Sequence, residues 1–216
     1  MEIKVYKEIM EASDQIAQQI RDLLDNFRIF AINLISSPGS GKTTLLERLI
    51  PVLEESGIKI GVIEGDLATS NDAERISRLN IPVAQINTGS GCHLGAEMVH
   101  QALKGFPLAK INLLIIENVG NLVCPTGFYL GENIKIGMMS VPEGDDKPVK
   151  YPLLLNVSEA IILNKIDLIP YTNFNKDNFI NYCKRINSKV KIFETCATTG
   201  EGITEFVDWL ILKSKT

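Results

Sequence analysis

A glycine-rich run, SSPGSGKT, lies between a continuous apolar stretch, FRIFAINLI, and a segment whose apolar residues have helical spacing. This order of strand, loop and helix is typical of phosphate binding, because backbone N–H groups and the positive end of a helix converge there. The residues expected to contact nucleotide phosphates or a magnesium ion are Gly39, Ser40, Gly41, Lys42, Thr43 and Thr44. Of these, Lys42 should reach the β- and γ-phosphates and Thr43 should ligate magnesium. One departure is that Ser36 replaces the first glycine of the common GxxxxGK(S/T) pattern.

Two motifs near the end of the sequence select the base. NKID follows the apolar stretch EAIIL. The carboxylate of Asp167 can accept two hydrogen bonds from the N1 and N2 edge of guanine, which adenine does not offer. We expect Asn164 to brace this loop and the stem of Lys165 to cover the base. CATTGEG follows the last predicted strand, so Ala197 and Thr198 are the expected backbone donors to guanine O6. With the phosphate loop, these motifs favour GTP over ATP.

Acidic residues leave two of the predicted strands near the phosphate loop. IIENVG places Glu117 at the end of a buried strand and Gly120 after it, and we expect the Gly120 N–H to sense the γ-phosphate. EGDLATSNDAER carries Asp66, expected on the magnesium side through water, and Asp72. Two interpretations of Asp72 stay open: it positions or deprotonates the attacking water, or it caps the next helix. No water-orienting glutamine follows Gly120, which predicts slow intrinsic hydrolysis.

Thiol and imidazole groups gather in two segments, TGSGCHLG with Cys92 and His93, and GNLVCPTG with Cys124. Thiolate with imidazole suits zinc or nickel. We place Cys92 and His93 at a helix start, where the dipole lowers a thiol pKa. The three ligands are one short of a closed tetrahedral site, which a two-fold dimer could complete by sharing ligands. The alternative is that both cysteines are buried packing residues and His93 is a capping residue.

Four further residues receive lesser roles. His100 lies about two helical turns after His93 on the expected helix, and is either an outer ligand or part of a solvated face. Cys183 and Cys196 are assigned to packing. Lys147, in the segment EGDDKP, either reaches across a dimer, or fixes its loop near the nucleotide, or is solvated.

Apolar runs alternate with segments of helical spacing, which predicts an α/β fold with a mostly parallel sheet covered by helices on both faces. A single domain is expected over 1–216, with an N-terminal helix at 1–27 and a nucleotide-binding core at 28–212. The segment 140–157 is expected to be a surface loop or short helix. The predicted strands are 28–35, 59–65, 82–87, 111–117, 134–141, 159–164 and 190–195. The predicted helices are 5–26, 43–57, 72–79, 93–104, 174–187 and 203–214.

Bulk properties exclude several classes of function. The chain has 216 residues, a net charge of -4 and a pI of about 5.3, so no basic field predicts nucleic-acid or acidic-lipid binding. We find no membrane span and no signal sequence, which predicts a cytoplasmic protein. In that reducing compartment the four cysteines should be thiols or metal ligands rather than disulfides.

Taken together, several motifs resemble those of the hydrogenase nickel-insertion GTPase, the HypB family, over about 28–212. The segments that carry the resemblance are SSPGSGKTTLL, GVIEGD, NDAERI, TGSGCHL, IIENVGNLVCP, SVPEGDDKPVKYP, NKIDL and CATTGEG. The resemblance implies a phosphate-loop GTPase of the signal-recognition, MinD and BioD class. It also implies a homodimer with Cys92, His93 and Cys124 as its interface site for nickel or zinc. The partners it implies are an accessory protein of the HypA family and the [NiFe]-hydrogenase large-subunit precursor.

The resemblance has limits. Many bacterial members begin with a Cys-rich nickel motif, whereas this N-terminal segment has no cysteine and the chain has two histidines. The sequence therefore looks like the short archaeal type, and tight nickel storage at that end is not expected. Accessory GTPases for urease and for a cobalamin mutase are alternatives that fit less well at 117–127 and 140–152. A nickel-binding storage protein is a second alternative, against which the intact Lys42, Thr43 and Asp167 argue.

Overall fold

A computed structural model describes residues 2–67 and 71–215 of the chain. Within them, seven strands form one sheet in which each neighbouring pair is parallel, and each predicted strand is confirmed. Continuous apolar runs form these strands because a strand covered on both faces has no solvent-facing side. The strands are β1 (Phe30–Ser36), β2 (Ile60–Asp66), β3 (Val83–Asn87), β4 (Leu113–Glu117), β5 (Ile134–Ser140), β6 (Ser158–Asn164) and β7 (Lys191–Glu194).

The strand order is β3-β2-β4-β1-β5-β6-β7: β2 and β3 lie on one side of β1, β4 returns to the place between β2 and β1, and β5 to β7 follow on the other side. In sheets of this kind ligands bind outside the carboxyl ends of the strands, where the winding direction reverses. The phosphate loop follows β1, and the acidic, thiol and base-reading motifs follow β2, β3, β4, β6 and β7. All of the predicted functional motifs therefore lie along one edge of the sheet.

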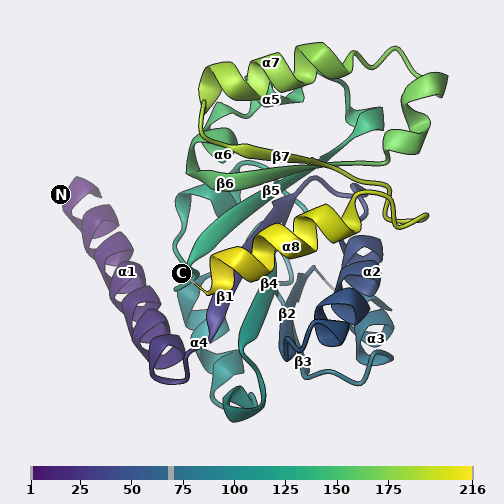
Figure 1. The fold of residues 1–216 in the computed structure, drawn as a ribbon. Coiled ribbons are helices and arrows are strands. Elements are labelled where there is room, and N and C mark those ends of the chain that lie inside the picture. Colours follow the sequence, from purple (N-terminus) through teal and green to yellow (C-terminus); the bar gives the residue numbers. More distant parts are fainter. Residues whose placement is uncertain (1, 68–70, 216) are drawn as a thin grey trace.

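Helices cover both faces of the sheet (Figure 1). Side chains alternate along β1, so Ile32 packs with α2, α3 and α8 on one face, whereas Ala31 packs with α1 and α4 on the other. α6 and α7 continue this second layer over β5 and β6. The helices are α1 (Glu2–Asn26), α2 (Lys42–Glu55), α3 (Asn71–Ser77), α4 (Ala96–Leu103), α5 (Lys147–Lys150), α6 (Pro152–Val157), α7 (Lys176–Ile186) and α8 (Ile203–Ser214). Short 3-10 helices are η1 (Leu108–Lys110), η2 (Cys124–Gly127), η3 (Val141–Glu143) and η4 (Ile166–Tyr171).

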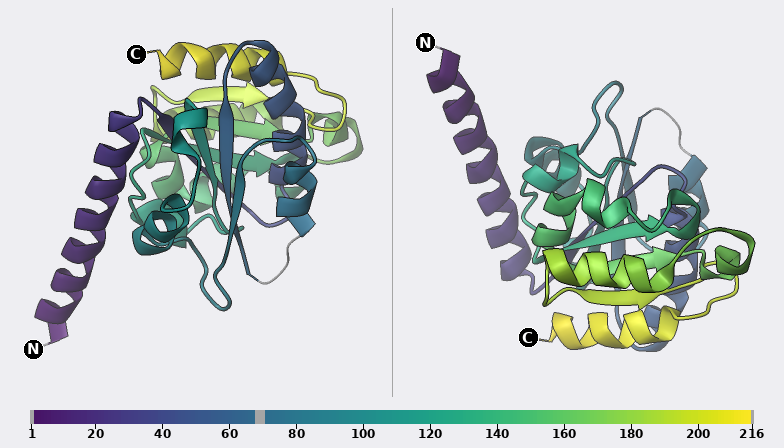
Figure 2. Two further views of the ribbon diagram at one scale, coloured as in Figure 1. Left: turned by 90° about the horizontal axis from the view of Figure 1, so that it is seen from below. Right: turned by 90° about the horizontal axis from the view of Figure 1, so that it is seen from above.

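The first part of α1 extends away from the sheet, and its last turns dock against the strand ends (Figure 2). Arg21 holds this contact, donating to the carbonyl oxygens of Gly131 at 2.9 Å and Ile29 at 3.1 Å. It also pairs with Asp25 at 2.8 Å. Since a buried guanidinium must be bonded, these contacts fix where α1 leaves the body of the protein.

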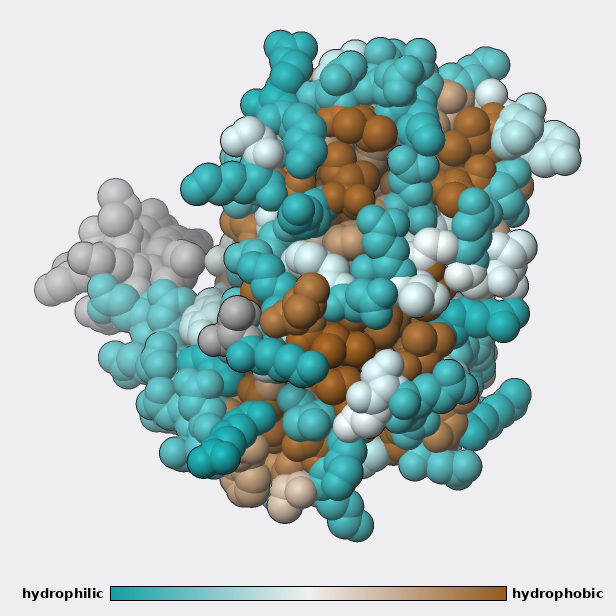
Figure 3. Space-filling model, viewed as in Figure 1, coloured by the Kyte–Doolittle hydropathy of each residue, from teal (hydrophilic) through white to brown (hydrophobic). Residues whose placement is uncertain are grey.

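Polar residues cover much of the face that carries α8, and apolar groups lie among them (Figure 3). Within the described residues, every helix is too short or too polar to cross a bilayer.

Two predicted segments differ in detail from the structure. α4 begins at Ala96, three residues later than predicted, because Gly95 adopts an extended conformation and ends the preceding glycine-rich loop. The segment 140–157 forms η3, α5 and α6, which confirms the short-helix alternative.

Candidate nucleotide and metal sites

The phosphate loop connects β1 to α2, as predicted. Gly39 and Gly41 have φ angles of 72° and 97°, which glycine adopts at little energetic cost. A Cβ at Gly41 would lie 2.8 Å from the side-chain nitrogen of Asn164, so the loop has no room for one. The Ser40 hydroxyl is buried and has no hydrogen-bond partner among the described residues. A buried polar group without a partner fits a loop that contacts a phosphate oxygen.

Two glutamates face each other at the ends of neighbouring strands. Glu64 on β2 is level with Glu117 on β4, and the two residues are only 2% and 1% exposed. Lys42 Nζ lies 4.0 Å from Glu117 Oε1, and the Thr43 hydroxyl donates to the same oxygen at 3.5 Å. The structure therefore brings Lys42, Thr43 and Glu117 together, as predicted. It adds Glu64, which we group with Glu117 as the carboxylate pair.

Burial favours the protonated form of each member of the carboxylate pair. Burial raises the pKa of Glu64 to about 11, and the adjacent Glu117 raises it further. Burial also raises the pKa of Glu117, although a hydrogen bond from Glu64 and the charge of Lys42 act in the opposite direction. One oxygen of each side chain is buried without a partner among the described residues. Carboxylate and hydroxyl oxygens are ligands that Mg²⁺ prefers, so this donor set fits magnesium.

Gly120 follows the end of β4, and Asp66 is the last residue of β2. A Cβ at Gly120 would lie 3.0 Å from Pro38 Cα, so glycine lets the segment after β4 contact the phosphate loop. Asp66 is half-buried, and its carboxylate accepts a hydrogen bond from the Leu67 N–H at 2.7 Å. Both residues thus lie at the edge of the sheet that carries the phosphate loop, as the sequence predicted.

Asp72 lies in the first turn of α3, which begins at Asn71, so it does not cap this helix from outside. Arg75 donates to its carboxylate at 3.3 Å. The same guanidinium donates twice to Glu47, at 3.0 and 2.7 Å, and once to the Thr44 hydroxyl at 3.2 Å. Because Glu47 and Thr44 are on α2, Arg75 fixes α3 and Asp72 against the helix that follows the phosphate loop.

A cavity of about 270 Å³ joins the phosphate loop to the loops after β6 and β7. Its walls come from all three nucleotide motifs of the sequence. The lining residues are Gly41, Thr44, Asn164, Lys165, Asp167, Leu168, Cys196, Ala197 and Thr198. Every residue predicted to hold the guanine base is therefore on one cavity, together with Leu168 and Cys196, which were not predicted to be there.

Asn164 braces this cavity with both ends of its amide, as predicted. Its Nδ2 donates to the Ser40 carbonyl at 2.8 Å. Its Oδ1 accepts hydrogen bonds from the Thr195 hydroxyl and the Ala197 N–H, both at 3.1 Å. Of the two predicted O6 donors, Ala197 thus donates to Asn164, whereas the Thr198 N–H has no partner among the described residues.

Two more side chains shape the cavity. Lys165 Nζ donates to the Gly39 carbonyl at 2.7 Å, so its stem crosses from the NKID loop to the phosphate loop. The Cys196 thiol donates to Asp167 Oδ1 at 3.1 Å and lies 3.1 Å from the Thr198 hydroxyl. Cys196 is buried, as a packing residue should be, but it also orients the carboxylate predicted to select guanine.

Cys92, His93 and Cys124 come together in space, with their ligand atoms all within 4.8 Å of one another. We call these residues the Cys–His–Cys group. Ligand atoms around a tetrahedral zinc ion lie about 3.5 Å apart, so small side-chain movements would close this set on a metal ion. The His93 ring stacks on Phe128 with centroids 4.0 Å apart. Because Cys92 is exposed and Cys124 is half-buried, burial in the core does not explain them, and the packing alternative is wrong.

The predicted electrostatics of this group are wrong. Cys92 and His93 lie in the loop before α4, because that helix begins at Ala96. A hydrogen bond with Cys124 raises the pKa of the Cys92 thiol, and burial lowers the pKa of His93. Cys92 therefore lacks the helix start that was expected to lower the pKa of its thiol. His100 is on α4 and, among the described residues, is not part of the group.

Two further candidates have partners within the chain. Lys147 pairs with Glu143 at 3.4 Å and lies 5.1 Å from the centre of the Tyr151 ring, so it is not a solvated lysine, and its reach across a dimer stays a prediction. Cys183 is fully buried in the core beside α7, which confirms its packing role.

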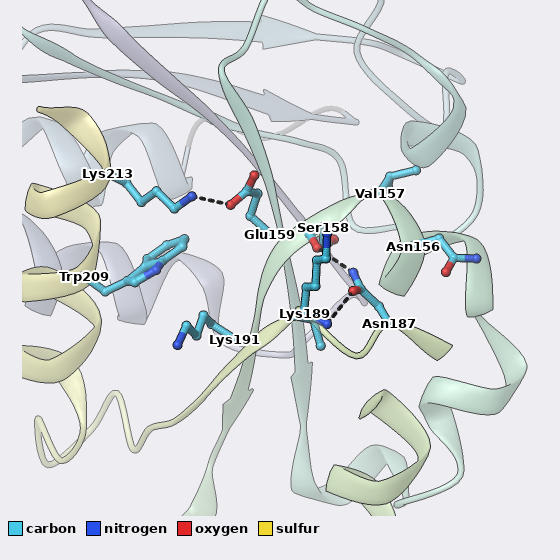
Figure 4. A pocket seen from close by; sticks show the side chains of 10 residues that line it. Asn156, Val157, Ser158, Glu159, Asn187, Lys189, Lys191, Trp209 and Lys213 are labelled. Carbon is cyan, nitrogen blue, oxygen red and sulfur yellow. Dashed lines mark hydrogen bonds and ion pairs between the residues drawn. The ribbon is translucent and has the colours of Figure 1, made fainter. Parts of the chain in front are cut away.

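A larger cavity, of about 490 Å³, lies at the opposite edge of the sheet near the starts of β6 and β7 (Figure 4). Lys189, Lys191 and Trp209 line it, and Lys213 pairs there with Glu159 at 2.6 Å. Among the described residues, its lining includes none predicted for nucleotide or metal binding. Parallel sheets bind ligands at the carboxyl ends of their strands, so the smaller cavity is the candidate site.

The geometry agrees with comparisons to known proteins. Residues 30–194 match the family model for the CobW/HypB/UreG nucleotide-binding domain. The hydrogenase maturation factor HypB of Escherichia coli (strain K12) is 42% identical over 208 residues, covering 96% of this chain and 71% of that protein. The chain belongs to the HypB family. These family members are phosphate-loop GTPases, so the resemblance and the fold class are both confirmed.

Two solved HypB structures share the whole fold. The structure of HypB from Helicobacter pylori in complex with nickel has a TM-score of 0.88 and 36% identity, covering 94% of this chain and 95% of that one. HypB from Archaeoglobus fulgidus has a TM-score of 0.88 and 37% identity, covering 95% and 100%.

Proposed function

We propose that this HypB protein is a GTP-hydrolysing metallochaperone that helps insert nickel into [NiFe]-hydrogenase during maturation. The observation that carries the proposal is the segment 117–124. It begins with a glutamate beside Lys42, contacts the phosphate loop at Gly120, and ends with Cys124 of the Cys–His–Cys group. A segment ordered by a γ-phosphate and its magnesium ion can thereby move a metal ligand.

The nucleotide roles follow from the cavity and the phosphate loop. Asp167 selects guanine, and the Thr198 N–H is the remaining donor for O6. Lys42 contacts the β- and γ-phosphates, and magnesium is held by Thr43 with Asp66 and the carboxylate pair nearby. When bound, the ion neutralises phosphate charge. Asp72, held by Arg75, positions the attacking water.

The metal is cargo rather than a resident cofactor. The Cys–His–Cys group offers two sulfur atoms and one nitrogen atom, which suit nickel or zinc. Three ligands leave a tetrahedral ion incomplete, so a homodimer supplies the rest. The exposed Val123, 59% accessible beside Cys124, supports a protein contact at this place. The family resemblance implies an accessory protein of the HypA family and the hydrogenase large-subunit precursor as further partners.

Phosphate release from GTP by the purified protein tests the enzymatic part of the proposal. We expect the protein to hydrolyse GTP slowly and not to hydrolyse ATP. The rate of GTP hydrolysis should decrease on the order of 100-fold or more in Lys42→Ala, because a phosphate-stabilising charge is lost. Equal hydrolysis of GTP and ATP, or an unaffected Lys42→Ala variant, would contradict it.

A further inference from the structure

Asn118, directly after β4, and Asn33, in the middle of β1, carry two amides with no exposure to solvent. A buried amide destabilises the fold unless its polar atoms are bonded. Asn118 Oδ1 accepts hydrogen bonds from the Leu94 N–H and the Val119 N–H, each at 3.0 Å, and its Nδ2 donates to Asn33 Oδ1 at 3.2 Å. The side chain is therefore held on both sides, in surroundings where water cannot replace a lost partner.

These bonds connect the phosphate site to the metal ligands. Asn118 directly follows Glu117 of the carboxylate pair, and Leu94 directly follows His93 of the Cys–His–Cys group. The Leu94 side chain is buried against Gly65, where a Cβ would lie 2.8 Å from it. The backbone beside His93 is thus fixed between the ends of β4 and β2.

Asn121 makes a second connection, on the exposed side. Its Nδ2 donates to the Cys92 carbonyl at 3.4 Å, and its Oδ1 accepts from the Val123 N–H at 2.8 Å and the Cys124 N–H at 3.4 Å. One amide therefore holds the two cysteine-bearing loops together. The two asparagines lie on either side of Gly120, the residue that contacts the phosphate loop.

We propose that Asn118 is the positioning residue through which the phosphate site controls the Cys–His–Cys group, with Asn121 keeping its two loops in register. The inference rests on the proposed function. When Gly120 moves toward a γ-phosphate, Asn118 moves with it. The Leu94 N–H follows Asn118 Oδ1, because breaking their buried hydrogen bond would leave the N–H and the amide oxygen without partners. His93 and Cys92 are thereby displaced relative to Cys124. By linkage, bound metal must change the affinity for the GTP analogue relative to GDP by the same factor.

The test compares Zn²⁺ and Ni²⁺ dissociation constants, from chelator competition, in the GDP·Mg²⁺ and non-hydrolysable GTP analogue·Mg²⁺ states. For the wild type we expect the two states to differ by about 5-fold to 150-fold. In Asn118→Ala the ratio should fall to within about 2-fold of unity, because the bond to Leu94 is gone. Asn187→Ala is the matched control: it removes an asparagine that donates to the Leu155 and Ser158 carbonyls at the opposite edge of the sheet, and it should keep the wild-type ratio.

The outcomes separate the inference from the proposed function. If the metal dissociation constants of the wild type are the same in the two nucleotide states, both the inference and the proposed function lose their basis. A wild-type ratio that survives in Asn118→Ala overturns only the inference, as does an equal loss of the ratio in Asn187→Ala. If Asn118→Ala is too unstable to purify, two other variants replace it. Asn118→Asp keeps an acceptor for the Leu94 N–H and should retain the ratio, whereas Asn118→Ser should lose it. The opposite pattern in this pair contradicts the proposal.

Discussion

The carboxylate pair and the Cys–His–Cys group lie along the same edge of the sheet, but the chain holds them in different ways. Glu64 and Glu117 are side chains of paired strands, almost completely buried, and fixed by the register between β2 and β4. Cys92, His93 and Cys124 come from loops and a 3-10 helix, and they are exposed or half-buried. The phosphate side is therefore preorganised by the fold, whereas the metal side depends on loops that a ligand can shift. This difference lets a bound nucleotide shift the metal ligands, and by linkage bound metal changes nucleotide affinity by the same factor.

The largest expected effect tests whether the Cys–His–Cys group binds a metal ion. Cys92→Ala should weaken Zn²⁺ and Ni²⁺ binding by at least about 100-fold, because one of three ligands is lost. Chelator competition measures the change. His100→Ala is the control, since His100 lies outside the Cys–His–Cys group. Equal affinities in wild type and Cys92→Ala would show that the metal binds elsewhere.

The carboxylate pair should make the stability of the protein depend on pH. The pKa of Glu64 is about 11 in the fold, against an ordinary value of 4.5, so folding requires proton uptake above pH 4.5. The stability that Glu64 contributes is thus fully present below that pH and is lost as pH rises toward 11. Glu64→Gln should stabilise the nucleotide-free protein at pH 8 by about 1–3 kcal/mol.

Thermal melting at two pH values checks this prediction. Each kcal/mol corresponds to about 2–4 °C in Tm for a chain of this size, and the two proteins should melt alike at pH 4. The exposed Glu55→Gln serves as control and should change Tm little at either pH. A Glu64→Gln variant that melts below wild type at pH 8 would show that Glu64 is ionised in the fold.

On the nucleotide side, Arg75 fixes Asp72 to α2. Arg75→Lys keeps the charge but loses the planar fork that contacts Glu47 twice. We expect kcat for GTP hydrolysis to fall about 10-fold while KM changes little, since positioning rather than binding is disturbed. Steady-state kinetics measure both, with the exposed Arg78→Lys as control. A change confined to KM would assign Arg75 to nucleotide binding.

The smallest effect concerns the guanine cavity. Cys196→Val removes the thiol that donates to Asp167, and should weaken GDP binding about 3-fold to 10-fold, the worth of one hydrogen bond. Cys196→Ser, which restores a donor, should bind GDP as tightly as wild type. Titration with a fluorescent GDP analogue measures both. If the valine variant binds normally and the serine variant does not, the thiol acts through packing alone.

The sequence predicted the fold and most of the candidate site because strands and phosphate loops have strong local signals. It missed residues whose roles depend on tertiary neighbours. Glu64 lies within an apolar strand, and only the register opposite Glu117 shows that it belongs to the site. Arg75 and Asn118 act through partners on other elements, which spacing cannot show. A buried acid in an apolar run, as in VIEG, is the one signal that could have identified Glu64.

The start of α4 was misplaced for a local reason. TGSGCHLG contains three possible ends for a glycine-rich loop, and helical spacing alone does not choose among them. Gly95 ends the loop in the structure, so Cys92 and His93 stay outside the helix and the expected dipole effect on the thiol is absent.

The most direct test of the account is native mass spectrometry of the nickel-loaded protein with GDP and with a non-hydrolysable GTP analogue, at one free nickel concentration. If bound phosphate controls the Cys–His–Cys group, the analogue should give a nickel-containing dimer and GDP should give a species that has lost its nickel. Identical nickel content and subunit stoichiometry in the two nucleotide states would contradict the account.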